Sequence, residues 1–552
     1  MDRRNFLTSV AAAGAAGAAA LAGCRSTPAA VPPGELLGTS LDLGHRLRDG
    51  GFAPPGETRH VPVLIVGAGI AGLSAGWKLA KAGFADFLLV ELENEAGGNS
   101  RAGGNAVSAY PWGAHYLPLP TREATAVREL LAELGVLQGD PRAAKPTYDE
   151  RYLCATPQER LYRDGRWQEG LLPQGAVSAA ELAQYQRFFD RMEAFRRQRD
   201  SQGRRAFALP MALSSRDAAL LVLDTISMHD WLLAQGFDSP HLQWYVNYTC
   251  RDDYGASSAA VSAWAGIHYF ACRDGEAQNA SSDTVLTAPE GNAWLARGML
   301  RSIRERAGDR LLGGALAFRV AGGNGPPGGP IEVDLWLPGE SRTVRVVTEQ
   351  LIWAAPLFLL PHVFSGYETL KSAARSYSYA PWLVANLTLS RFPDDRRGAP
   401  RAWDNVLYDS SALGYVVATH QQMRVWPGAT VLTYYRAFDD MSPQQGRQML
   451  RDTPREVWAE RIFAELERPH PNIRLLTTRL DVFRNGHAMA RPTPGLIWGT
   501  ARARFEGDGT RLRFAHADVS GFSLFEEAQY RGVLAGERTL RQLGVRHSSS
   551  LT

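Results

Sequence analysis

The residues best suited to chemistry lie in a glycine-rich turn between two apolar runs, residues 63–66 and 87–90. The second run ends on Glu91, which lies 19 residues after the last glycine of the turn. Such a strand–turn–helix–strand unit binds a dinucleotide, because the helix N-terminus attracts the pyrophosphate and the acid accepts hydrogen bonds from the ribose. The same carboxylate would repel a 2′-phosphate, which disfavours NADP. The residues expected around the phosphates are Gly67, Gly69, Ile70, Ala71 and Gly72.

A second pair of glycines follows Glu91 after five residues and belongs to no minimal NAD fingerprint. It resembles the extended motif of FAD enzymes of the flavin-containing amine oxidase and phytoene desaturase superfamily, in which the glycines pass close to the cofactor. The resemblance implies that the cofactor is FAD. The residues that it places beside FAD here are Gly97, Gly98, Asn99 and Arg101.

The order of elements along the chain predicts an α/β fold. We expect a Rossmann-type FAD-binding domain (glutathione-reductase-like, amine oxidase type) that is interrupted twice by a mixed helical and β substrate domain. The FAD-binding domain would comprise residues 61–120, 286–360 and 486–545. The substrate domain would comprise residues 121–285 and 361–485. Residues 25–60, with five prolines, read as a tether in front of the folded body.

Further segments resemble the amine oxidase superfamily in order and over most of residues 61–543. A loop with Gly113 would pass near the isoalloxazine, and a strand with Ala317 would hold the adenine through backbone atoms. The helix near the C-terminus would direct its N-terminus at the flavin, where its dipole stabilises a reduced ring. The residues that the C-terminal motif assigns to the cofactor are Asp518, Glu527 and Ala528.

The catalytic candidates follow from the same resemblance. His115 lies in the Gly113 loop and could move a proton or bond to the flavin, although a structural role on a surface loop fits equally well. Phe522 or Phe525 would form an aromatic wall beside the flavin. Many amine oxidases carry a lysine in the strand corresponding to residues 382–390, but this strand has none. That absence leaves a dehydrogenase as open as an oxidase.

The N-terminus carries a targeting pattern. The twin arginines Arg3 and Arg4 precede an Ala/Gly-rich stretch that ends in Leu21-Ala-Gly-Cys24, which resembles a bacterial lipobox. We therefore expect residues 1–24 to be a Tat lipoprotein signal peptide, with the Tat translocase as a partner during export. Lipidation of Cys24 would anchor the protein to a membrane on the periplasmic side. A cysteine that is incidental to a signal for a soluble Tat substrate is the alternative.

The overall composition excludes several classes of function. A net charge of +3 over 552 residues provides no attraction to nucleic acid. The cysteines show no metal-ligand spacing, and we expect no metal site. No HExxH, P-loop or plausible Ser-His-Asp set is present, so hydrolase or NTPase chemistry has no visible machinery.

The sequence therefore predicts an exported FAD-dependent oxidoreductase that takes hydride from a C–H bond of a small-molecule substrate. The α-carbon of an amine, for example a polyamine, is the leading site of hydride removal, and oxygen or a quinone would accept the electrons. A desaturase or dehydrogenase of an apolar polyene, porphyrinogen or lipid-like substrate is the alternative. A non-catalytic FAD-binding scaffold is a second alternative.

Overall fold

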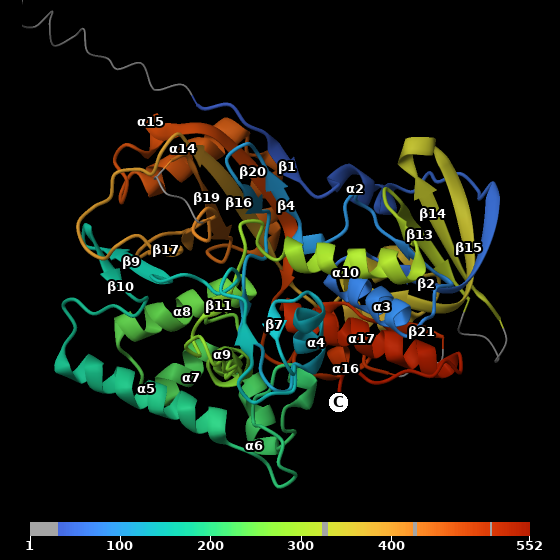
Figure 1. The fold of residues 1–552 in the computed structure, drawn as a ribbon, viewed down its shortest axis with the longest axis horizontal. Coiled ribbons are helices and arrows are strands. Elements are labelled where there is room, and N and C mark those ends of the chain that lie inside the picture. Colours follow the sequence, from blue (N-terminus) through green and yellow to red (C-terminus); the bar gives the residue numbers. More distant parts are fainter. Residues whose placement is uncertain (1–30, 323–328, 423–427, 508–510) are drawn as a thin grey trace, which may run out of the picture.

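The computed structural model describes residues 31–322, 329–422, 428–507 and 511–552. Two β-sheets lie side by side, each with its own helices (Figure 1). The predicted signal peptide, including Cys24, lies outside the described residues. Among the helices of these ranges, none is both long and apolar enough to cross a membrane.

The first sheet contains the predicted dinucleotide-binding unit. Its middle strands β3 (Phe87–Val90), β2 (Glu57–Val66) and β15 (Arg342–Trp353) are parallel, and a helical crossover joins β2 to β3. Strands β13 (Leu316–Ala321), β14 (Ile331–Leu337) and β15 form an antiparallel meander. Residues 63–66 of β2 are almost completely buried, as expected for a strand covered on both faces. In spatial order the strands are β12 (Leu311–Leu312), β3 (Phe87–Val90), β2 (Glu57–Val66), β15 (Arg342–Trp353), β14 (Ile331–Leu337) and β13 (Leu316–Ala321), and β21 (Leu512–Phe514) pairs with β15.

Helices α3 (Ile70–Lys81), α10 (Ala293–Ala307) and α17 (Phe525–Gln542) pack together beside this sheet (Figure 1). Small residues let α17 approach α3 closely: a Cβ at Gly532 would lie 2.1 Å from the Ala71 carbonyl oxygen. The close contact fixes the C-terminal helix against the first Rossmann helix.

The second sheet has eight strands and contains β16 (Tyr379–Leu389), all of whose residues are buried. Its edges pair with β20 (Thr477–Ala490) and β19 (Thr430–Ala437). On one face Leu383 belongs to an apolar cluster with Trp458, and on the other Trp382 belongs to a cluster with Trp112 and Tyr248. In spatial order the strands are β1 (Leu36–Gly38), β20 (Thr477–Ala490), β16 (Tyr379–Leu389), β19 (Thr430–Ala437), β18 (Gly414–Val417), β17 (Asp404–Leu407), β9 (Glu159–Arg163) and β10 (Arg166–Glu169).

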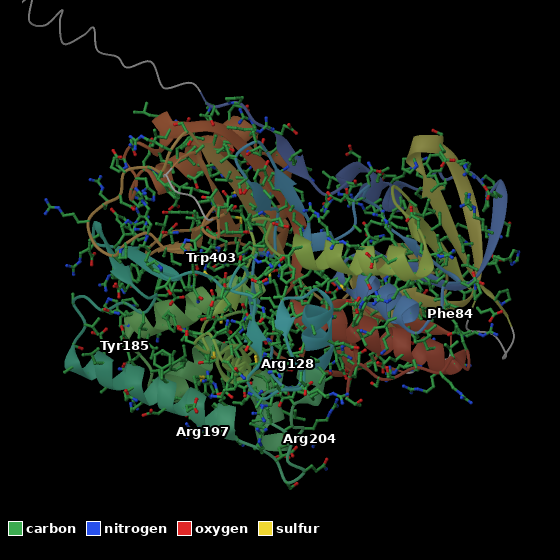
Figure 2. The ribbon with its side chains drawn as sticks, in the orientation of Figure 1. Phe84, Arg128, Tyr185, Arg197, Arg204 and Trp403 are labelled. Carbon is green, nitrogen blue, oxygen red and sulfur yellow. The ribbon has the colours of Figure 1, made fainter. Side chains whose placement is uncertain are left out.

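A helical layer follows β10 and has its own apolar core, to which all five of its helices contribute. Serine side chains cap several of these helices; Ser178, for example, forms a capping box with Glu181. The layer consists of α5 (Ala179–Arg197), α6 (Ala218–Leu221), α7 (Met228–Ala234), α8 (Pro240–Tyr254) and α9 (Ala263–Cys272). Figure 2 shows Trp403, which precedes β17, in the region where the second sheet meets this layer; its ring belongs to one buried cluster with Tyr248 of α8.

The remaining elements are short or peripheral. The helices are α2 (Leu41–Asp49), α4 (Thr125–Glu133), α11 (Leu360–Val363), α12 (Glu368–Ala374), α13 (Pro443–Asp452), α14 (Arg455–Leu466), α15 (Ile473–Leu476) and α16 (Thr500–Ala503). The strands are β4 (Ala102–Gly104), β5 (Ala109–Pro111), β6 (Leu117–Pro118), β7 (Leu137–Gln138), β8 (Thr147–Tyr148) and β11 (Val285–Leu286).

The predicted tether differs from what the structure shows. Of residues 25–60, those from Leu36 onward form β1, α2 and the first part of β2 rather than a free linker. Strand β1 pairs in parallel with β20, and α2 packs on β13 and α11. Of the prolines that suggested a tether, Pro32 and Pro33 precede β1, and Pro54 and Pro55 lie between α2 and β2. Such short elements give too little periodicity to be seen in the sequence.

Candidate active site

The glycine-rich turn has the close contacts that only glycine permits. Gly67 has φ of +99°, and its N–H donates to the Val90 carbonyl oxygen at 2.8 Å. A Cβ at Gly67 would lie 2.8 Å from the Ala354 carbonyl oxygen, and one at Gly72 would lie 1.8 Å from the Gly67 carbonyl oxygen. A side chain at Gly67 or Gly72 would therefore collide with the protein backbone. Gly69 begins α3 and has no side chain with which to cap it, so the helix N-terminus remains suited to an anion.

The second glycine pair lies directly against this turn. The Gly97 N–H donates to the Ala68 carbonyl oxygen at 2.8 Å, and Gly97 and Gly98 both have positive φ. A Cβ at Gly69 would meet only the Gly98 Cα, at 3.9 Å. Two glycine-lined backbone segments thus face each other with no side chain between them, which suits close approach of a pyrophosphate.

Glu91 ends β3 at the same edge of the sheet. Its carboxylate accepts hydrogen bonds from the Ala68 N–H at 2.7 Å and the Glu93 N–H at 3.1 Å. Burial raises the pKa of Glu91, and these two amides oppose the rise. A carboxylate has about four acceptor positions, so about two remain for ribose hydroxyls. We call the Gly67–Gly72 turn, Glu91 and the Gly97–Gly98 pair the cradle; its chemistry fits a dinucleotide with a free ribose.

The other predicted residues of this domain lie around the cradle. The Arg101 Nε donates to the Gly98 carbonyl oxygen, and its guanidinium pairs with Glu93 at 3.4 Å. The Asn99 carbonyl oxygen accepts from the Ala114 N–H, and a Cβ at Gly113 would lie 2.4 Å from that oxygen. Ala317 is buried in β13, two residues after Ala315, whose N–H donates to the Glu91 carbonyl oxygen.

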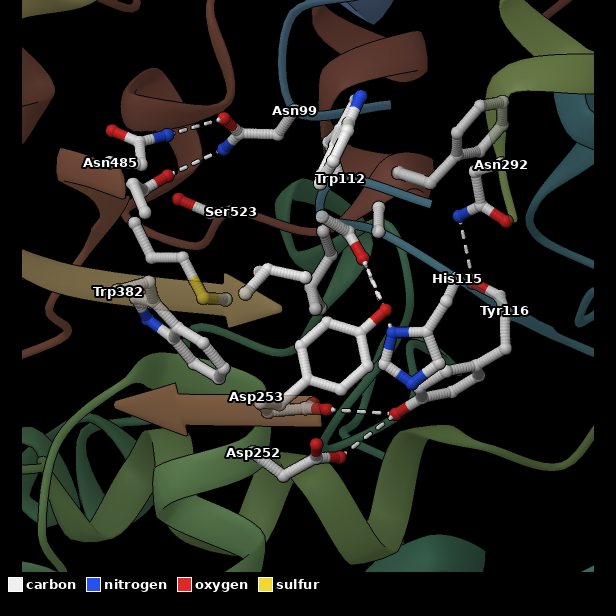
Figure 3. Close-up of a pocket in the computed structure, with 18 of the residues that line it drawn as sticks. Asn99, Trp112, His115, Tyr116, Asp252, Asp253, Asn292, Trp382, Asn485 and Ser523 are labelled. Atoms are coloured by element: carbon white, nitrogen blue, oxygen red, sulfur yellow. Dashed lines mark hydrogen bonds between the residues drawn. The ribbon is translucent and has the colours of Figure 1, made fainter. Parts of the chain in front are cut away.

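A cavity of about 140 Å³ begins where the Gly113 loop and Asn99 meet. Its walls come from segments far apart in the sequence: the 112–116 loop, α8, β16, β19, the end of β20 and the start of α17 (Figure 3). Aromatic rings dominate the walls. They belong to Trp112, His115, Tyr116, Trp382, Tyr435 and Phe525.

The Gly113 carbonyl oxygen orders two of these rings. It accepts from the Tyr435 hydroxyl at 3.1 Å and lies 3.3 Å from the His115 Nδ1. The His115 ring stacks on Tyr435 with centroids 4.5 Å apart. Burial lowers the pKa of His115 to about 4, so the ring is neutral at pH 7. A proton on Nδ1 that is shared with Gly113 leaves Nε2 as a hydrogen-bond acceptor.

The cavity is acidic at one end. Asp252 and Asp253 of α8 both accept from the Tyr116 hydroxyl, at 3.2 and 3.3 Å, and Glu526 of α17 also lines the cavity (Figure 3). Arg273 binds Asp253 at 2.5 Å and is the cation among the cavity-lining residues. Three carboxyl groups thus face one guanidinium, and this imbalance favours a bound cation.

Two of these carboxyl groups have unusual acidity. Burial raises the pKa of Asp252 to about 7, and the Asp253 carboxylate adds to the rise. Burial also raises the pKa of Glu526 to about 7, although a hydrogen bond from its own backbone amide acts to lower it. Glu526 is only 4% exposed and, within the described ranges, has no other hydrogen-bond partner. Perturbed carboxyl groups in a cavity are typical of functional sites.

The C-terminal motif is divided between the cavity and the core. Phe525 lines the cavity, whereas Phe522 is fully buried in the helical core and stacks on His268 with centroids 5.1 Å apart. Phe522 therefore does not form the aromatic wall that the sequence allowed. Glu527 also points away from the cavity, because its carboxylate accepts from the Met211 N–H at 2.6 Å. Ala528 follows on the same helix turn and is 9% exposed.

Asp518 is completely buried at the end of the first sheet. Its carboxylate accepts from the Leu357 N–H at 2.9 Å and from the Tyr379 hydroxyl at 2.7 Å. Burial alone would raise the pKa of Asp518, but His516 and these hydrogen bonds hold it below the usual value. The carboxylate thus joins the segment after β15 to β16. This position is beside the cradle's sheet rather than in the aromatic cavity.

Among the described residues, no lysine lines the cavity. Lys78 is buried against Glu537, and Lys81, Lys145 and Lys371 pair with glutamates elsewhere. Along β16 the cavity is lined by Trp382 and Val384. Asp252, Asp253, Glu526, Tyr435 and Trp382 were not predicted. A pattern such as Asp-Asp near a helix end is common in any sequence, and only the tertiary structure brings these residues together.

Comparisons with known proteins agree with this architecture. Residues 65–134 match the family model described as an NAD(P)-binding Rossmann-like domain. The structure resembles wild-type putrescine oxidase bound to putrescine, with a TM-score of 0.62 and 16% identity over 89% of this chain and 100% of that chain. It also resembles cyclohexylamine oxidase from Brevibacterium oxydans IH-35A, with a TM-score of 0.61 and 14% identity over 88% of this chain and 99% of that chain.

A third similar structure is a fatty acid isomerase from P. acnes that produces CLA, with a TM-score of 0.56 and 13% identity over 87% of this chain and 98% of that chain. No curated protein sequence matches the chain. The predicted fold class is confirmed: the chain has an α/β fold with a Rossmann-like dinucleotide-binding domain, arranged as in these amine oxidases.

Proposed function

We propose that the protein is an FAD-dependent oxidoreductase that removes hydride from the α-carbon of an amine. The observation that carries this proposal is the aromatic cavity beside the cradle, in which three carboxyl groups face a single arginine. A protonated amine supplies the missing positive charge, and aromatic faces also attract cations. The similarity in fold to two amine oxidases supports the same reading.

The cradle would hold the cofactor. The N-terminus of α3 and the facing glycines would bind the pyrophosphate, and Glu91 would accept hydrogen bonds from the ribose. The Gly113 loop, Asn99 and the N-terminus of α17 would surround the flavin end. FAD, when bound, supplies the hydride acceptor. The side chains of the protein would remove the proton of the amine, orient the amine and exclude water.

The side chains of the cavity would prepare the amine. Hydride leaves only from a neutral amine, so the ammonium proton must first be removed. Asp252, with a pKa of about 7, is suited to accept that proton at neutral pH. The neutral His115 would then orient the amine N–H through Nε2. Trp382, Tyr435 and Phe525 would exclude water and hold the α-carbon in place. The resulting imine is hydrolysed by water to a carbonyl compound and a released amine.

A lipid-like substrate is the second candidate, because the fold also resembles a fatty acid isomerase. The cavity argues against a fatty acid, since the carboxylate of such a substrate would meet Asp252, Asp253 and Glu526. A neutral polyene avoids this repulsion but would leave Asp252 and Glu526 without a counterion, since Arg273 already pairs with Asp253. The amine therefore fits better.

The electron acceptor is proposed to be a quinone or oxygen. In the described residues the cavity contains no lysine that could position a water at the flavin. This composition favours a dehydrogenase with a quinone over an oxidase.

An anaerobic titration tests the function. The purified protein should show a flavin absorbance spectrum that bleaches on addition of a panel of mono-, di- and polyamines. Admission of air should leave the flavin reduced until a quinone is added. A flavin that is bleached by no amine would overturn amine oxidation and favour the polyene or scaffold alternatives. Absence of flavin would overturn the FAD proposal itself.

The variant Asp252→Asn tests the role of the cavity acid. Loss of a general base typically lowers the rate by about 100-fold or more, and kcat/KM for the best amine should fall by that amount. Glu305→Gln is the matched control, because Glu305 is exposed on α10. An Asp252→Asn enzyme within threefold of the wild type would contradict the assigned role.

We also propose export by the Tat translocase and lipidation at Cys24, on the basis of the sequence pattern in residues 1–24. Replacement of Arg3 and Arg4 together by lysine should keep the protein in the cytoplasm. Cys24→Ala should release it from the membrane fraction without changing its flavin content. A Cys24→Ala protein that stays in the membrane would overturn the lipid anchor.

A further inference from the structure

The N-terminal segment from Leu36 to Phe52 runs along the site and belongs to neither sheet alone. Its first part, β1, pairs with residues 482–484 of β20 in the second sheet. Its last residue, Phe52, stacks on Phe318 of β13 in the first sheet, with centroids 4.0 Å apart and an interplanar angle of 12°. The segment therefore bridges the two sheets (Figure 1, blue).

Between these ends the segment contacts the residues that follow the cradle. The Ser40 N–H and hydroxyl both donate to the Glu93 carboxylate, at 2.9 and 3.0 Å. Glu93 lies two residues after Glu91 and pairs with Arg101, whose Nε donates to the Gly98 carbonyl oxygen. One chain of polar contacts thus connects Ser40 to the glycine pair of the cradle.

The stack of Phe52 on Phe318 lies beside the strand that is proposed to hold the adenine. Phe318 follows Ala317 directly, and the Arg46 guanidinium lies over both Phe52 and Trp336, at 5.0 and 4.4 Å from the ring centroids. An aromatic stack with a cation over it adds to the stabilisation that burial of the rings provides. Helix α2 is thereby held against β13 at the adenosine end of the cradle.

We propose that residues 36–52 form a strap that retains the dinucleotide, so that the cofactor leaves only when the strap is displaced. The inference rests on the proposed FAD binding. The contacts with Glu93 and Phe318 lie next to the two residues assigned to the adenosine, Glu91 and Ala317. Ser40 and Glu93 are 53 residues apart in the sequence, and Phe52 and Phe318 are farther apart still. Both contacts therefore form only in the folded protein, where they would hold the strap against the adenosine end of the cradle.

The dissociation rate of FAD tests the strap. The holoprotein is diluted into cofactor-free buffer, and the rise of free-flavin fluorescence is followed. The double variant Ser40→Ala/Phe52→Ala should release FAD at least fivefold faster than the wild type. Ser40→Thr keeps the hydroxyl and should release FAD within twofold of the wild-type rate. Asp49→Asn, a change at an exposed position on the same helix, is the matched control.

The melting temperature of the cofactor-free protein separates retention from simple stabilisation. A double variant whose apoprotein melts at a lower temperature but whose FAD dissociation rate is within twofold of the wild type would overturn the strap. Faster release with an unchanged apoprotein melting temperature would support it. A wild-type protein that binds no flavin would overturn the FAD proposal and the strap together, whereas an unchanged rate in a flavin-bearing variant overturns the strap alone.

Discussion

The cradle and the cavity are adjacent, but they are built in opposite ways. The cradle comes from residues 67–98, a single βαβ unit whose backbone geometry would bind the dinucleotide. The cavity comes from segments spread from residue 99 to residue 526, and its properties depend on side chains. A backbone site tolerates almost no change at its glycines, whereas a side-chain site can be retuned one residue at a time. The comparison suggests that the cofactor is fixed by the fold and the substrate is chosen by the cavity.

The largest expected effect concerns the glycine of the cradle with the closest contact. A Cβ in Gly72→Ala would lie 1.8 Å from the Gly67 carbonyl oxygen, so the turn must open. We expect the variant to bind no flavin, as measured by absorbance after purification. Gly56→Ala is the control, since a Cβ at Gly56 would meet nothing within 4 Å. Normal flavin content in Gly72→Ala would show that the cradle is not fixed by backbone geometry.

The next effect separates the two phenylalanines that the sequence could not distinguish. Phe522→Ala should lower the free energy of unfolding by about 3–5 kcal/mol, because the ring is fully buried. Phe525→Ala should instead raise KM or lower kcat for the amine, because this ring lines the cavity. Chemical denaturation and steady-state kinetics on both variants check the pair. Equal kinetic losses at equal stability would contradict the division between core and cavity.

A smaller effect is expected at the acid of the cradle. Glu91→Gln keeps the shape of the side chain but removes the charge that the ribose hydroxyls would bind. We expect the dissociation constant of FAD to rise about tenfold, which corresponds to about 1.4 kcal/mol. Titration of apoprotein with FAD measures the change. An unchanged constant would mean that the hydrogen bonds from Ala68 and Glu93 occupy the carboxylate fully.

The smallest effect is a dependence of stability on pH. The pKa of Asp252 is raised from 3.8 to about 7 in the folded protein, so the folded state binds a proton that the unfolded state releases between these values. The stabilising contribution of this proton is complete below about pH 4 and is lost as the pH rises through 7. Asp252→Asn should therefore stabilise the protein at pH 8 and should have little effect near pH 4. Equal effects at both pH values would contradict the raised pKa.

The sequence predicted the cradle because its requirements are local. A positive φ at Gly67, a helix N-terminus and an acid at the end of the next strand all leave marks within about 30 residues. The same reasoning failed for residues 36–52, whose short strand and helix are defined by partners in β20 and β13. It also could not choose between Phe522 and Phe525. The two residues are three positions apart where the chain enters α17, and only the packing there decides which ring faces the cavity.

What the sequence alone determined, then, is the βαβ unit, the α/β fold class and the absence of a lysine in β16. Only the tertiary structure decided which carboxyl groups share a cavity. Asp252 and Glu526 are separated by more than 270 residues, and each becomes unusual only where the other packed elements exclude water. Desolvation depends on everything that surrounds a group, and that environment is set by the complete fold rather than by neighbouring residues in the chain.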